Sequence, residues 1–65
     1  MSASIAAELA VTADHLSRYR ERIAAMATTL GSGRNDDAVA AIYEAERSLR
    51  TAHRLLERAA SLLGT

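Results

Sequence analysis

The chain has 65 residues with eight acidic and eight basic side chains, so its formal net charge is zero. A neutral chain has no general attraction to nucleic acids or anionic membranes, and the absence of cysteine excludes disulfide bonds and thiolate metal sites. One helical domain over residues 1–65 is expected, and at this length self-association is a common supplement to a small core.

The N-terminal residues lack the features of an export signal. Glu8 and Asp14 interrupt the first apolar stretch, and no basic segment precedes it. No apolar run approaches the roughly 20 residues that a membrane-spanning helix needs. We therefore expect a cytoplasmic protein without a membrane partner.

The first predicted element is a helix over about residues 4–30. Its larger side chains recur in alternating steps of three and four residues, which is the seam of a heptad repeat with positions a to g. Ser4 or Ser2 is the expected N-cap. Position a holds Leu9, Leu16, Ile23 and Leu30, and position d holds Ile5, Thr12, Tyr19 and Met26.

A glycine-containing stretch, LGSGRNDD, follows this helix. Gly31 is expected to end the helix with a positive φ. Glycines before a helix can also cradle phosphate, but no strand precedes them, lysine is absent, and two aspartates put negative charge at the start of the next helix. A structural turn is therefore expected, with Asn35 or Asp36 as the N-cap of the second helix. The turn residues are Gly31, Gly33, Asn35 and Asp36.

The second predicted helix covers about residues 36–63, and its heptad has large residues at position a and alanine at position d. If the chain reverses near Arg34, position a of the first helix faces an alanine row, which lets the two helix axes approach closely. Position d of the first helix then faces position a of the second. The a set is Ile42, Leu49, Leu56 and Leu63, and the d set is Ala38, Ala45, Ala52 and Ala59.

The apolar stripe is wider than a contact between two helices requires. Leu55 and Leu62 lie at position g, beside the a seam of the second helix. The expected fold is therefore all-α: an antiparallel two-helix hairpin, 4–30 and 36–63, that dimerises into a four-helix bundle. The residues expected in the core and in self-association are Leu9, Leu16, Ile23, Leu30, Ile42, Leu49, Leu55, Leu56, Leu62 and Leu63.

Four arginines form a stripe along the second helix, within about 80° of one another on a helical wheel. Like charges at i,i+4 destabilise a helix mildly, so the stripe is a candidate face for an acidic partner, and a solvated surface is the other interpretation. In length and hairpin design the chain resembles the small plasmid-encoded RNA-binding dimers that form antiparallel four-helix bundles. This resemblance of fold implies nucleic-acid binding as the alternative function. The stripe is Arg47, Arg50, Arg54 and Arg58.

His15 and His53 are the candidate metal ligands of the sequence. Glu8 and Glu46 precede them by seven residues, about 10 Å along a helix, whereas helical bundles usually place such a glutamate three residues away. His53 and Glu57 are four residues apart and would need further ligands from a partner. Interface histidines, with no metal or other cofactor, are therefore expected.

The combined patterns favour a non-enzymatic helical hairpin that self-associates and acts as a protein-interaction or regulatory module. No serine has a credible base and orienting acid, and a narrow bundle offers little concave volume. Arg20 and Glu46 fall at the same height in the predicted hairpin. A cross-hairpin ion pair between them is expected, with its main value in orientation.

Overall fold

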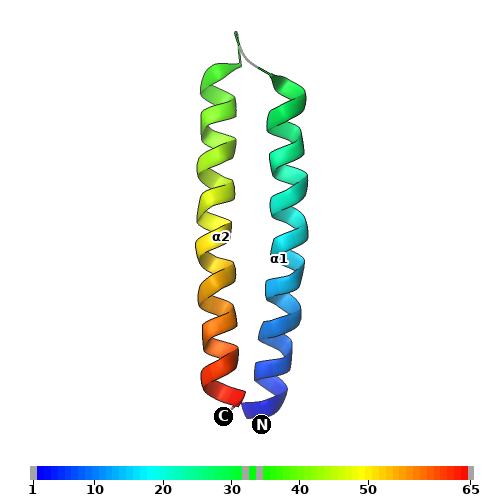
Figure 1. The fold of residues 1–65 in the computed structure, drawn as a ribbon, viewed down its shortest axis with the longest axis vertical. Coiled ribbons are helices and arrows are strands. Elements are labelled where there is room, and N and C mark those ends of the chain that lie inside the picture. Colours follow the sequence, from blue (N-terminus) through cyan, green and yellow to red (C-terminus); the bar gives the residue numbers. More distant parts are fainter. Residues whose placement is uncertain (1, 32, 34, 65) are drawn as a thin grey trace.

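The computed structural model consists of two long antiparallel helices joined by a short turn (Figure 1). It describes residues 2–31, 33 and 35–64 of the chain. Helix α1 spans Ser2–Leu30 and helix α2 spans Asp36–Gly64, and the described residues contain no strand. The helices pack side by side in a rod of 50 × 14 × 11 Å. The predicted all-α antiparallel hairpin is therefore confirmed.

The turn between the helices has a conformation that its glycines allow. Gly31 has a φ of 71° and Gly33 a φ of 97°, a region that residues with a Cβ rarely enter. The Gly31 N–H donates to the Ala27 carbonyl oxygen at 3.2 Å, which ends α1 with a left-handed residue, as predicted. Ser32 and the predicted reversal point Arg34 lie outside the described residues.

Helix α2 begins with Asn35 in the N-cap position. The Asn35 carbonyl oxygen accepts the first helical hydrogen bond, from the Val39 N–H at 2.8 Å. The Asp36 carboxylate accepts a hydrogen bond from the Gly33 N–H at 2.8 Å, so it fastens the turn to the start of the helix. At the other end of the hairpin α1 includes Ser2 as its first residue and Ser4 two residues later, so the prediction of either serine as the N-cap is wrong.

On α1 the contact between the helices is formed mainly by heptad positions a and e rather than by the predicted a and d, whereas on α2 the d residues Ala52 and Ala59 are half-buried along with positions a and e. Ala13 and Ala27, both at e, are the fully buried apolar side chains among the described residues, with 1% and 2% of their surface exposed. Tyr19 and Met26, at d, remain 52% and 57% exposed. The prediction that position d of the first helix packs inside the hairpin is therefore wrong.

Small side chains at position e explain this rotation of the contact. Alanine at this position of α1 lets the helix axes approach most closely on that side, and Arg20, at the same position, meets Glu46 across the contact. The large side chains at position a then cover only one side of the contact between α1 and α2. The half-buried members of the predicted core are Leu9, Leu16, Ile23, Ile42, Leu49 and Leu56, and its exposed members are Leu30, Leu55, Leu62 and Leu63.

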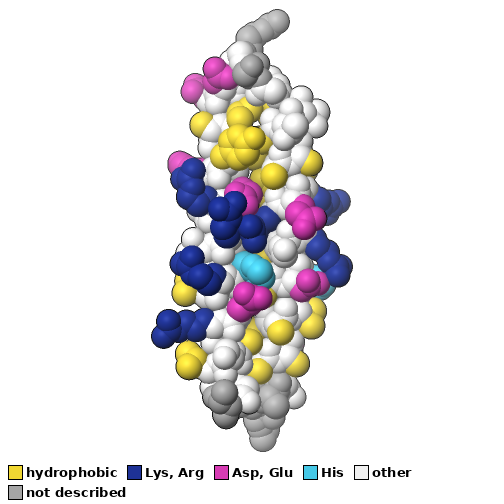
Figure 2. Space-filling model, viewed as in Figure 1, with side chains coloured by type: hydrophobic (Ala, Val, Ile, Leu, Met, Phe, Trp, Pro, Cys, Tyr) yellow, Lys and Arg dark blue, Asp and Glu magenta, His cyan; other side chains and the backbone are white. Residues whose placement is uncertain are grey.

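The hairpin consequently has two unlike faces. In an antiparallel pair, equal heptad positions of both helices lie on the same side of the contact, so positions d and g gather on one face and positions b and f on the other. The second of these, the polar face, is seen in Figure 2, where side chains of both charges gather over the middle of both helices. The first, the apolar face, consists of Ile5, Thr12, Tyr19, Met26, Ala38, Ala45, Ala52, Ala59, Leu55 and Leu62.

Candidate interaction surfaces

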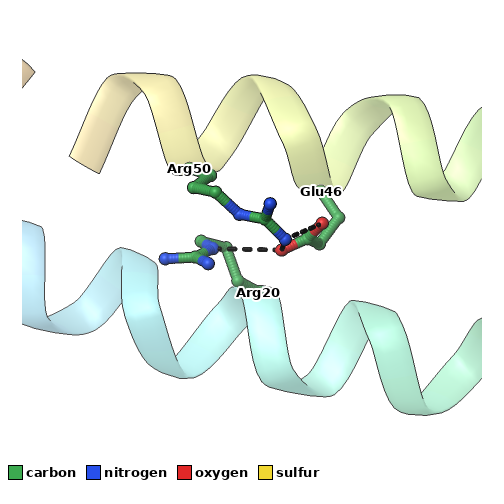
Figure 3. A network of polar contacts seen from close by, with 3 residues as sticks. All are labelled: Arg20, Glu46 and Arg50. Atoms are coloured by element: carbon green, nitrogen blue, oxygen red, sulfur yellow. Dashed lines mark hydrogen bonds and ion pairs between the residues drawn. The ribbon is translucent and has the colours of Figure 1, made fainter. Parts of the chain in front are cut away.

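A cluster of three charged side chains joins the helices on the polar face (Figure 3). The Arg20 Nε of α1 donates to the Glu46 Oε2 of α2 at 3.2 Å, which confirms the predicted ion pair. The Arg50 Nη2 donates to both carboxylate oxygens of Glu46 at 3.0 Å. Only 13% of the Glu46 side chain and 20% of the Arg20 side chain are exposed, so this pair is shielded from water. The cluster therefore fixes the register of the two helices, with Arg20 of α1 and Glu46 of α2 at the same level along the rod.

The two arginines control the ionisation of Glu46. Partial burial opposes the charged carboxylate and by itself would raise its pKa. The hydrogen bonds and positive charges of Arg50 and Arg20 outweigh this effect, so the pKa of Glu46 lies below its usual value of 4.5. Glu46 therefore stays ionised at neutral pH and keeps both arginines in place.

Acidification should weaken the hairpin through Glu46. Because folding lowers the pKa of this carboxyl, its stabilising contribution is complete above the usual value of 4.5 and is lost as the pH falls through the lower folded-state pKa. We expect the melting temperature to decline below pH 4.5 and the decline to be smaller in Glu46→Gln. The control Glu21→Gln removes an exposed carboxyl and should keep the wild-type pH dependence. Identical pH profiles for the wild type and Glu46→Gln would contradict this role.

The predicted arginine stripe follows an edge of α2, where dark-blue side chains line one side of the rod in Figure 2. All four of its guanidinium groups belong to exposed residues. Arg50 is already engaged by Glu46. Among the described residues, Arg47, Arg54 and Arg58 have no carboxylate oxygen within the 4.0 Å of an ion pair. Three of the four predicted residues therefore make no ion pair within the described part of the hairpin.

The two histidines lie in different surroundings. His53 is half-buried between the helices, and its Nε2 is 3.4 Å from the Glu57 Oε2. His15 is exposed on α1 and lines a hollow of about 210 Å³ with Arg18, Tyr19 and Arg22. The described part of the chain brings no three histidine, aspartate or glutamate side chains together in a way that could hold a metal ion.

A shallow apolar groove lies near the turn, and the sequence patterns did not reveal it. It measures about 460 Å³ and is lined by both helices. The signal that could have located it is the predicted facing of position d of the first helix by position a of the second, because Met26 and Ile42, one from each row, both line the groove. The lining residues are Ala25, Met26, Thr29, Leu30 and Ile42. The groove continues the apolar face, because Met26 belongs to both.

The chain was compared with known proteins by sequence and by structure. No family model, curated protein or solved structure matches it. Over the residues that the structure describes, neither helix combines the length and the apolar character needed to cross a membrane.

Proposed function

We propose that this protein is a non-enzymatic helical hairpin that self-associates, two copies forming a four-helix bundle, and that it serves as a protein-interaction or regulatory module. The observation that carries the proposal is the lack of a core in the single hairpin. Its fully buried apolar side chains are two alanines among the described residues. Large apolar side chains remain exposed at Ile5, Val11, Tyr19, Met26, Leu30, Tyr43, Leu55, Leu62 and Leu63.

Covering the apolar face would supply the missing stabilisation. Fully burying one large apolar side chain contributes roughly 1.5–3 kcal/mol, whereas ordering each residue costs roughly 1–2 kcal/mol. A hairpin with a half-buried seam offsets little of that cost. A second copy placed on the apolar face covers the d row of α1 and the neighbouring leucines of α2, such as Leu55, in one step.

The polar face supports a structural role for its charged groups. Glu46 is held by two arginines, Asp14 pairs with Arg18 at 3.0 Å, and His53 lies beside Glu57. Each of these contacts joins side chains of the hairpin itself.

Nucleic-acid binding along α2 stays the alternative. It draws on Arg47, Arg54 and Arg58, which have no ion pair among the described residues. The neutral overall charge gives this surface no long-range advantage. Self-association accounts for the larger exposed feature, the apolar face, and is therefore proposed first.

Sedimentation equilibrium at micromolar concentration tests the proposal. We expect a mass of twice the 6.9 kDa chain, together with a melting temperature that rises with protein concentration, because mass action stabilises a folded dimer. A folded monomer whose melting temperature is independent of concentration would contradict self-association.

A further inference from the structure

We propose that the second copy binds the apolar face with its turn at the same end of the bundle, so that α1 of each copy lies against α2 of the other. The inference rests on the self-association proposed above and adds the orientation and the contacts. Two features of the apolar face carry it: the sizes of its side chains and the charges at its edges.

The apolar face has a large row and a small row. The d residues of α1 are mostly large, and those of α2 are all alanine. Thr12 fits the large row because its hydroxyl donates to the Glu8 carbonyl oxygen at 2.8 Å and so already has a hydrogen-bond partner within its own helix. The large row is Ile5, Thr12, Tyr19 and Met26, and the small row is Ala38, Ala45, Ala52 and Ala59. Each copy therefore carries both halves of a large-against-small contact.

A two-fold axis parallel to the rod fixes the register without further assumption. Rotation about such an axis leaves every height unchanged, so each residue of α1 meets the α2 residues of the second copy that lie at its own height. The Arg20–Glu46 contact sets these heights within one hairpin. Tyr19 then lies between Ala45 and Ser48 of the second copy.

The same heights hold along the whole face. Met26 lies between the second copy's Ala38 and Ala41. Near the termini, Ile5 lies between the second copy's Ala59 and Leu62. Every large side chain of α1 thus enters a gap beside an alanine, which is the packing that fills space at close helix separation.

The edges of the apolar face carry charges that complement a second copy. Glu8 and Arg22 lie at position g of α1, and Glu44 and Arg58 lie at position c of α2. At the heights fixed above, Glu8 lies level with the second copy's Arg58, and Arg22 lies level with the second copy's Glu44. Among the described residues, none of the four has an opposite charge within 4.0 Å in its own hairpin. Their complementarity identifies the occupant of the face as another copy of this chain.

The opposite orientation satisfies the charges but not the sizes. With the turns at opposite ends, α1 packs on α1 and α2 on α2, so Glu8 meets Arg22 and Glu44 meets Arg58. The large row then meets itself, the alanine row meets itself, and His15 lies beside its own copy. Helix separations would have to differ across one bundle, whereas the parallel arrangement gives two equal contacts. The sizes therefore decide the orientation.

A distance measurement between the two turns tests the orientation. The chain has no cysteine, so Asn35→Cys carries a single nitroxide at an exposed site beside the turn. In the dimer the two α2 helices lie diagonally across the bundle, about 14 Å apart for neighbouring axes about 10 Å apart, so pulsed electron paramagnetic resonance should give a short distance between the labels, on the order of 15–25 Å. A dimer with a distance near the 50 Å length of the rod would overturn the orientation and leave self-association standing. A monomer in sedimentation of the same sample would overturn both.

Charge reversal gives an independent test. Arg58→Glu should weaken the dimer about tenfold, because it places like charges at two symmetric edges. Adding Glu8→Arg should restore wild-type affinity, because the two reversed charges, at positions 8 and 58, again lie opposite each other in the parallel bundle. In the opposite orientation the double variant sets Arg22 against a new arginine and Glu44 against a new glutamate, and affinity would fall further, which would overturn the proposal.

The matched control for charge reversal is Arg47→Glu. Arg47 lies on the same helix and is exposed, but it belongs to position f, on the polar side of the rod. Its reversal should leave the dimer dissociation constant unchanged within about twofold. A loss equal to that of Arg58→Glu would mean that net charge, rather than a pair at this edge, governs association, and it would overturn the edge contact.

Discussion

Replacing Leu56 with alanine should lower the free energy of unfolding by about 2–5 kcal/mol, the usual cost of truncating a packed leucine. Leu56 lies at position a of α2 and is half-buried between the helices before any partner is added. Since a domain of this size rarely has more than about 3–5 kcal/mol of stability from its core, this change should leave little folded protein at room temperature. Urea titration followed by circular dichroism measures the loss.

Val11→Ala is the control for this variant. Val11 is an apolar residue of α1 with 55% of its surface exposed, and it belongs to position c, away from the helix contact. Its truncation should change the free energy of unfolding by less than about 0.5 kcal/mol. Equal losses for Leu56→Ala and Val11→Ala would show that the a row does not form the seam.

The helices and the turn could be predicted because each rests on a local rule. The heptad steps from Leu9 onward require a helix with one apolar side, and Gly31 supplies the positive φ that ends it. The pairing of Arg20 with Glu46 followed from counting heights across the turn and is present at 3.2 Å. Each of these features depends on only a few residues, and the sequence offers no second set of residues that could form it in another way.

The rotation of the helix contact could not be predicted, because alanine occupies two competing rows. Ala45 and its d neighbours form a small row on α2, while Ala13 and Ala27 form another at position e of α1. Either row permits close approach of the helices. The hairpin buries the α1 row and leaves Ala38 and Ala45 of the α2 row exposed, while Ala52 and Ala59 are half-buried. A heptad pattern in one chain does not state which contact is internal and which is external.

The candidate surfaces were predictable to different degrees for the same reason. The arginine stripe follows from spacing on a single helix, and Arg47, Arg54 and Arg58 are indeed exposed together. The apolar groove depends on how α1 and α2 are rotated about their axes, so Met26 and Ile42 could be placed near each other but not in a partly open hollow. A feature that lies on one helix does not depend on how α1 and α2 are rotated about their axes. A feature formed by both helices does depend on that rotation.

Replacing Ala45 with lysine should abolish most of the proposed dimer while leaving the hairpin helical. Ala45 is exposed in the hairpin, so a longer side chain has room there until the second copy's Tyr19 arrives. Overpacking costs about 1–3 kcal/mol per site, and a two-fold axis creates two such sites, each beside the second copy's Arg22. We therefore expect the dissociation constant, measured by sedimentation equilibrium, to rise roughly a hundredfold or more.

Ala40→Lys separates this effect from a general effect of charge or bulk. Ala40 is an exposed alanine on the same helix, five residues away, at position f on the polar side of the rod. Its replacement adds the same charge and volume where no second copy is placed, so the dimer dissociation constant should stay near the wild-type value. A dimer unaffected by Ala45→Lys would place the contact on another face. Equal weakening by both substitutions would remove the alanine row from the interface. If the row contacts the second copy, lysine at position d should weaken the dimer and lysine at position f should not.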